Sequence, residues 1–141
     1  MNDKNYSYER RALQVLIFIG ACVPVFAGAK GMIFGSTGFG ESIDISLDSH
    51  VRYLSGLLLA IGLSFWSLIP NIQDKIIQVR LLTFLVVVGG CGRLAAAIFI
   101  GMPSMPMFMA IGMELIVTPL FCLWQSRVYK LSNKNLHGVL A

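Results

Sequence analysis

Two oppositely charged residues, Arg93 and Glu114, lie within stretches of the sequence that are otherwise long and apolar. A charged side chain at the centre of a membrane-spanning helix costs about 2.5–3.5 kcal/mol on insertion scales, so it usually has a partner or a function. Glu114 is the only acidic or basic residue between Gly101 and Arg127, which makes it the best partner for Arg93. We therefore expect these two side chains to form an ion pair inside a helical membrane protein.

The spacing of the two charges predicts that they lie at the same depth. Arg93 precedes Gly101 by eight residues, and Glu114 follows Pro106 by eight residues, on either side of a tight proline-containing hairpin. With the rise of an α-helix, each charge lies about 12 Å below the hairpin. Small residues share the helical face of Arg93, as is typical of helix contacts in membranes. The two helices should be antiparallel neighbours with both charges facing inward.

Four more polar residues cluster at the start of the second apolar stretch: Asp48, His50, Arg52 and Tyr53. Asp48 precedes Arg52 by four residues, which places both on one helical face. Either Asp48 or Ser49 is expected to cap this helix. Together with Arg93 and Glu114, the four residues form our predicted ligand-binding site. Because the two arginines outnumber the deep carboxylate, the site favours a small anionic or amphipathic ligand, such as a lipid headgroup.

Other interpretations of these charges stay open. The ion pairs could only fix helix packing in a non-catalytic structural or assembly subunit. Glu114 could instead serve as the acid/base of a membrane-embedded lipid-modifying enzyme, or relay a proton or cation. No GxSxG, HExxH or Walker motif is present in the sequence, and these are the motifs of common soluble enzymes. We therefore predict neither catalytic residues nor a cofactor.

The composition is that of a membrane protein. Of the 141 residues, 56% are hydrophobic and 13% are charged, and the mean hydropathy is +0.74. The formal net charge is +4, but the basic residues are scattered in short flanks between apolar stretches. This pattern is typical of topology signals and argues against a nucleic-acid partner. The expected partner is the lipid bilayer, and the glycine-rich helix faces could support a homo-oligomer.

The apolar pattern predicts an all-α integral membrane protein, a bundle of four transmembrane helices. The expected spans are residues 12–30, 50–69, 77–101 and 107–126, within a domain of residues 11–129 that separates a cytoplasmic N-terminus (1–10) from a cytoplasmic tail (130–141). Pro24 and Pro119 predict bends, and residues 30–49 are predicted to form a loop outside the membrane. Lysine and arginine are more frequent beside both termini and between the second and third spans, so the positive-inside rule places both termini in the cytoplasm.

Two residue clusters resemble metal-binding sites, one with soft sulfur ligands and one with hard oxygen ligands. Five of the seven methionines lie between Met102 and Met113, and thioethers suit Cu(I), although adaptable packing is the better explanation. The carboxylates of Glu41, Asp44 and Asp48 lack the spacing of a calcium loop. The three cysteines lack CxxC spacing and are expected to be packing residues. The predicted site therefore contains no metal ligand, and both clusters stay open as alternatives.

Five short segments resemble a known family: LDS (47–49), VRYLSG (51–56), GGCGRL (89–94), MEL (113–115) and LWQ (123–125). They are similar to small bacterial four-helix inner-membrane proteins catalogued as a domain of unknown function, among them AciT-type envelope proteins. The resemblance covers about residues 11–129. It implies a multi-pass protein of the bacterial inner (plasma) membrane that contributes to cell-envelope integrity through lipid or small-molecule handling. The family's charged positions correspond to Asp48, Arg52, Arg93 and Glu114.

Overall fold

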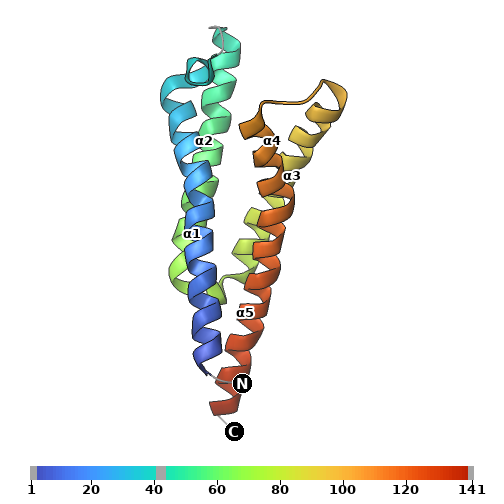
Figure 1. Ribbon diagram of the computed structural model, residues 1–141. Helices are drawn as coiled ribbons and strands as arrows, with labels where there is room; N and C mark the ends of the chain where they lie inside the picture. The colour runs from blue at the N-terminus through green and yellow to red at the C-terminus, as the bar shows by residue number, and fades with distance from the viewer. Residues whose placement is uncertain (1–2, 41–43, 140–141) are drawn as a thin grey trace. The chain divides into compact units, whose positions relative to one another are not determined.

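In the computed structural model, residues 3–40 and 44–139 are described, and every regular element within these ranges is helical. The elements are α1 (Asp3–Phe34), η1 (Gly35–Phe39), α2 (Ile45–Leu68), η2 (Ile69–Asp74), α3 (Ile76–Phe99), α4 (Met105–Gly112), η3 (Met113–Val117) and α5 (Thr118–Val139), as Figure 1 shows. Of the short elements, η1 and η2 are 3₁₀-helices and η3 is a π-helix. The predicted all-α class is confirmed.

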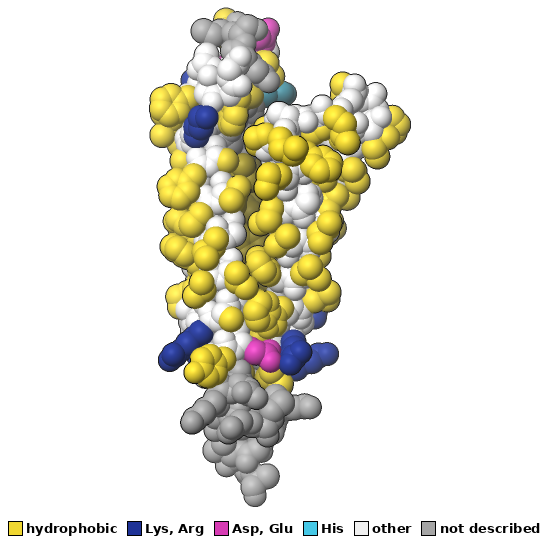
Figure 2. Space-filling model, viewed as in Figure 1, with side chains coloured by type: hydrophobic (Ala, Val, Ile, Leu, Met, Phe, Trp, Pro, Cys, Tyr) yellow, Lys and Arg dark blue, Asp and Glu magenta, His cyan; other side chains and the backbone are white. Residues whose placement is uncertain are grey.

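Four helical stretches are long and apolar enough to cross a membrane: Tyr6–Phe39, Ile45–Asp74, Ile76–Phe99 and Met105–Asn133. Three of the predicted spans lie inside these stretches, and the third predicted span ends two residues beyond its helix. Hydrophobic side chains cover much of the visible helix surface (Figure 2), and Phe26, Phe99 and Leu123 are 68%, 85% and 68% exposed. A helix that is apolar on its exposed sides is suited to a lipid environment.

The connection between the first two long helices is more helical than the sequence suggested. Helix α1 runs through Pro24 and ends only at Phe34, and α2 already begins at Ile45. The prediction of a loop over residues 30–49 was therefore wrong for most of that range. Glu41, a member of the predicted acidic loop, lies outside the described residues.

The N-terminal cap of α2 is also different from the prediction. The side chain of Asp44 accepts a hydrogen bond from the backbone N–H of Leu47 at 2.8 Å, so Asp44 is the cap. The prediction of Asp48 or Ser49 was wrong because the helix starts one turn earlier than the apolar pattern indicates. Asp48 lies in the first turn, where a carboxylate interacts favourably with the helix dipole.

The chain forms two compact units, of which one is Gln14–Pro70. Here α1 and α2 run antiparallel, with small residues allowing close approach of the two backbones. A Cβ atom built on Gly28 would lie 2.6 Å from the backbone nitrogen of Leu59. Towards the other end of the hairpin, the rings of Phe18 and Trp66 stack with centroids 5.4 Å apart. The indole N–H of Trp66 donates to the carbonyl of Phe18 at 3.2 Å.

The other unit comprises Met1–Leu13 and Asn71–Ala141. Helix α3 packs against α4, η3 and α5, which together form the returning arm of a hairpin (Figure 1). Its buried residues include Ile72, Val79 and Val128. The buried amide of Gln125 donates to the carbonyl of Ile72 at 2.7 Å and ties α5 to the turn before α3.

Candidate functional site

The predicted ion pair between α3 and the returning arm is present. Arg93 Nε lies 3.2 Å from Glu114 Oε1, and the side chains of Arg93 and Glu114 are 37% and 17% exposed. The pairing is the one that the scarcity of charge in these stretches predicted. It compensates two charges that would otherwise be costly in an apolar environment.

Glu114 belongs to the π-helical turn η3, and the residues that follow explain this turn. The carbonyl of Met113 accepts hydrogen bonds from both the backbone N–H and the side-chain hydroxyl of Thr118, the latter at 2.9 Å. Pro119 comes next, and a proline lacks an N–H and clashes with the carbonyl four residues before it in an α-helix. The wider turn relieves this conflict. Single π-turns inside α-helices frequently occur at functional sites.

Gly90 allows the close contact between α3 and η3. A Cβ atom built at this position would lie 2.9 Å from Glu114 Cβ and 2.8 Å from Leu115 Cδ2. Gly90 lies one helical turn before Arg93, so the absence of a side chain there lets the carboxylate arm approach the arginine. The prediction that the glycine cluster serves close packing is confirmed for Gly90, whereas a Cβ atom built at Gly89 or Gly92 would meet no described atom within 4 Å.

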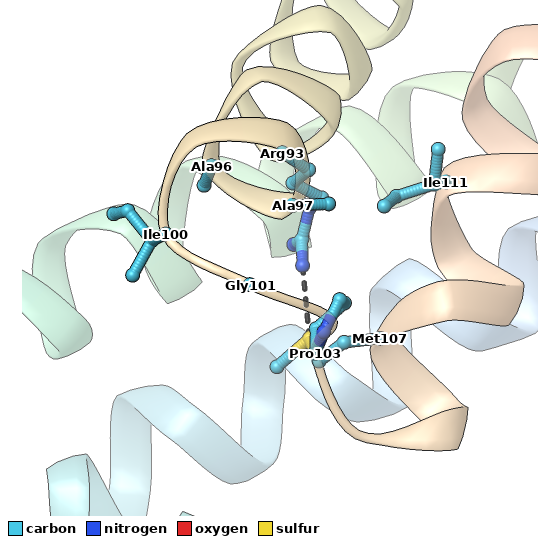
Figure 3. Close-up of a pocket in the computed structure, with 8 residues that line it drawn as sticks. All are labelled: Arg93, Ala96, Ala97, Ile100, Gly101, Pro103, Met107 and Ile111. Atoms are coloured by element: carbon cyan, nitrogen blue, oxygen red, sulfur yellow. Dashed lines mark hydrogen bonds between the residues drawn. The ribbon is translucent and has the colours of Figure 1, made fainter.

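Met107 is a second partner of Arg93, and the sequence interpretation missed it. Arg93 Nη1 donates to the thioether sulfur of Met107 at 3.0 Å (Figure 3). The sequence did contain one signal for this contact. Met107 precedes Glu114 by seven residues, about two helical turns, so both side chains are expected on the helical face that meets Arg93. The methionines of this region were considered only as packing residues or copper ligands. One of them instead contacts the charged group.

A pocket of about 250 Å³ lies beside the guanidinium group, between the end of α3 and α4 (Figure 3). Apart from Arg93, its side chains are apolar, and they include Ala96, Ala97, Ile100, Pro103 and Ile111. Ile111 is 7% exposed, whereas Ile100 is 88% exposed. The pocket therefore extends from a buried floor to an exposed rim. Glu114 does not line it.

Asp48 and Arg52 form a separate ion pair, in the unit Gln14–Pro70, that ties α2 to the end of α1. Arg52 Nε donates to Asp48 Oδ2 at 2.7 Å, as their four-residue spacing predicted. Arg52 Nη1 also donates to the carbonyls of Met32 and Ile33, at 3.0 and 2.8 Å. Asp48 Oδ1 accepts from the backbone N–H of Ser36 at 2.9 Å. The pair thus satisfies backbone groups at a helix C-terminus, which otherwise lack partners.

His50 and Tyr53 accompany this second ion pair on α2. Both side chains are exposed, Tyr53 to 66%. The six predicted ligand residues thus divide between the two units, with four on α2 and the pair Arg93 and Glu114 in the other unit. That all six residues form one ligand-binding site stays a prediction. Among the described residues, no three His, Cys, Asp or Glu side chains gather as a metal site would require.

The class of protein that these features define is an all-helical chain with four helices apolar enough to cross a membrane and an ion pair within the last two. The model of the family described as "Domain of unknown function (DUF4345)" matches residues 12–125, and the chain belongs to this family. The resemblance to a domain of unknown function is thereby confirmed. No curated protein and no solved structure matches the chain.

Proposed function

We propose that this chain is a multi-pass protein of the bacterial inner membrane that binds or moves a small anionic or amphipathic ligand at Arg93. The observation that carries the proposal is the position of the guanidinium group beside a largely apolar pocket. There its Nη1 donates to the sulfur of Met107, and a thioether is a weak acceptor. An oxyanion is a much better partner for this group, because it adds the attraction between opposite charges and can accept two parallel hydrogen bonds from the guanidinium.

Glu114 supports this interpretation through its two carboxylate oxygens. Oε1 is 3.2 Å from Arg93 Nε, so the carboxylate holds the guanidinium and compensates its charge when the pocket is empty. Oε2 is buried, and no hydrogen-bond partner for it is found among the described residues. Native structures rarely leave a buried polar atom in this state, and such atoms call for an explanation. A site that changes partners during binding is one such explanation.

The binding proposal is tested by native mass spectrometry of the protein extracted from membranes. The wild type should retain a bound lipid or small anion, and the Arg93→Gln variant should lose it. Arg80→Gln is the matched control, because Arg80 is an exposed arginine on the same helix. The proposal fails if the wild type carries no such species, or if Arg93→Gln carries the same species in the same amount.

The membrane orientation is part of the proposal. Basic residues beside the spans support cytoplasmic termini: Lys4, Arg10 and Arg11 before the first, Lys75 and Arg80 between the second and third, and Arg127, Lys130 and Lys134 after the fourth. Reporter fusions at each terminus test this, using a fluorescent protein that matures in the cytoplasm and a phosphatase active only outside it. Both termini should give fluorescence without phosphatase activity. A contribution to cell-envelope integrity rests on the resemblance to envelope proteins.

A structural or assembly subunit is the second candidate function. The pair Asp48 and Arg52 favours it, because this pair binds backbone groups at the end of α1. Exchanging the other pair, by Arg93→Glu together with Glu114→Arg, separates the two functions. The exchange should restore stability lost in either single variant under both proposals. Only a structural role predicts that it also restores function, whereas a ligand-binding role predicts that the bound species stays lost. A lipid-modifying enzyme stays a prediction from the sequence.

A further inference from the structure

We propose that the pocket beside Arg93 accepts a single-chain amphiphile with one compact oxyanion as its head, and that this head replaces the sulfur of Met107 on the guanidinium. The inference rests on the proposed function and names the ligand class. It joins three observations: the chemistry of the pocket walls, the size and burial of the pocket, and the kind of acceptor that the arginine now has.

The walls of the pocket limit the ligand to one charged group. Among the described residues, Arg93 is the single charged side chain that lines it, and the other lining residues have no side chain that donates or accepts a strong hydrogen bond. A sugar, a nucleotide or a polyanion would lose hydration at several polar groups without compensation, which is unfavourable. A carboxylate, sulfonate or phosphate monoester on an alkyl chain presents one polar group to the arginine and apolar groups to everything else.

The size of the pocket indicates where the alkyl chain lies. Its volume of about 250 Å³ falls just below the range of about 300–1,000 Å³ that is usual for sites of drug-sized ligands. The pocket therefore holds a compact head and the first few methylene groups. Beyond these, the chain leaves over the rim at Ile100, whose side chain is 88% exposed.

The side chain of Met107 is suited to move away from Arg93 when a ligand binds. Its sulfur accepts from Arg93 at 3.0 Å, and the side chain is 39% exposed on α4. Methionine has an unbranched, flexible side chain that adopts new rotamers readily. The thioether therefore satisfies the guanidinium in the empty site and moves aside when an oxyanion arrives. Leucine at this position would keep the volume and remove the competing acceptor.

The probes for this inference are methanesulfonate, 1-hexanesulfonate and 1-hexanol, titrated calorimetrically into the full-length protein in phosphatidylcholine nanodiscs. Sulfonates do not titrate near neutral pH, so the charge of the probe is constant. Each methylene buried is worth about four-fold in affinity, so three in the pocket predict that hexanesulfonate binds at least ten-fold more tightly than methanesulfonate. Hexanol, which has the chain without the charge, should bind much more weakly than hexanesulfonate.

Three variants locate the probe. Met107→Leu should tighten hexanesulfonate binding by about two- to ten-fold, the usual net contribution of one hydrogen bond. Ala97→Phe should abolish binding by filling the pocket, whereas Ala95→Phe, at an exposed neighbour that does not line it, should not. Ala97→Phe keeps both residues of the ion pair, so the test does not depend on whether Arg93→Gln folds.

The outcomes separate this inference from the proposed function. Equal affinities for the two sulfonates, both abolished by Ala97→Phe, would refute the amphiphile and keep a free anion as the ligand. Unchanged or weaker binding in Met107→Leu would refute the exchange with sulfur. If neither sulfonate binds the wild type, or hexanol binds as tightly as hexanesulfonate, both the inference and the anion site of the proposed function are wrong.

Discussion

Replacing Gly90 by alanine tests the contact on which the site depends. The added Cβ atom would lie 2.8 Å from Leu115 Cδ2 and 2.9 Å from Glu114 Cβ, both closer than a Cβ atom tolerates. Adding a carbon to a well-packed interface costs about 1–3 kcal/mol, while alanine gains about 1 kcal/mol over glycine inside a helix. The net change in unfolding free energy is therefore a loss of up to about 2 kcal/mol.

The adjacent Gly89 provides a matched control for this substitution. A Cβ atom built at Gly89 meets no described atom within 4 Å, so Gly89→Ala should stabilise the protein by about 1 kcal/mol through helix propensity alone. The propensity term cancels in the difference between the two variants. That difference measures only the clash, and we expect it to be about 1–3 kcal/mol in favour of Gly89→Ala.

The measurement is equilibrium unfolding in mixed micelles of a mild detergent and dodecyl sulfate, followed by tryptophan fluorescence in a Trp66→Phe background, so that Trp124 on α5 is the reporter. Trp124 lies in the same unit as Gly90, so it reports on the hairpin concerned. If Gly90→Ala is as stable as Gly89→Ala, the close packing of α3 on η3 is wrong. The alignment of Glu114 with Arg93 would then lose its structural basis.

Four further substitutions give graded expectations for stability. Gly28→Ala should cost about 2 kcal/mol in unfolding free energy, because its Cβ would meet backbone atoms that cannot move aside, the closest at 2.6 Å, and a clash of about 3 kcal/mol is offset by about 1 kcal/mol of helix propensity. Gly56→Ala, with its nearest neighbour a methionine sulfur at 3.8 Å, should instead stabilise the protein by about 1 kcal/mol. Arg52→Ala should lower the free energy of unfolding by about 1–2 kcal/mol. This is near the low end for charge-assisted hydrogen bonds, because the arginine side chain is 44% exposed. Backbone hydrogen exchange should become faster at the end of α1 and stay unchanged in α3. Arg127→Ala, which breaks the 2.9 Å pair with Glu9, should cost less than about 1 kcal/mol because the arginine is 67% exposed; a larger loss in urea or thermal unfolding would contradict this.

The sequence was sufficient to pair Arg93 with Glu114 because charges are rare in long apolar stretches. With one acidic group available in the following helix, the choice of partner was nearly forced. The pairing of Asp48 with Arg52 could be predicted equally well from the sequence, since a four-residue spacing on a helix brings side chains together. In both cases the evidence is local or depends on a very small number of candidates.

Other features depend on information that residue types do not carry. The acceptors of Arg52 are backbone carbonyls at the end of α1. Because every residue has such a carbonyl, nothing in the sequence indicates this contact. The cap at Asp44 was missed because the first turn of α2 is polar and does not continue the apolar pattern. The partnership of Met107 with Arg93 depends on the rotation of α4, which the π-turn alters.

The π-turn that contains Glu114 holds one residue more than an α-helical turn. One extra residue puts the faces of α4 and α5 out of phase by about 100° relative to an uninterrupted helix. Ile111 can therefore form the floor of the pocket while Gln125 and Val128 independently fill the core against α3 and the turn before it. Deleting one residue from Met113–Val117 would make α4 and α5 one continuous α-helix. Ile111 would then rotate out of the pocket by more than a quarter of a turn, while the distal half of α5 would keep its packing against α3.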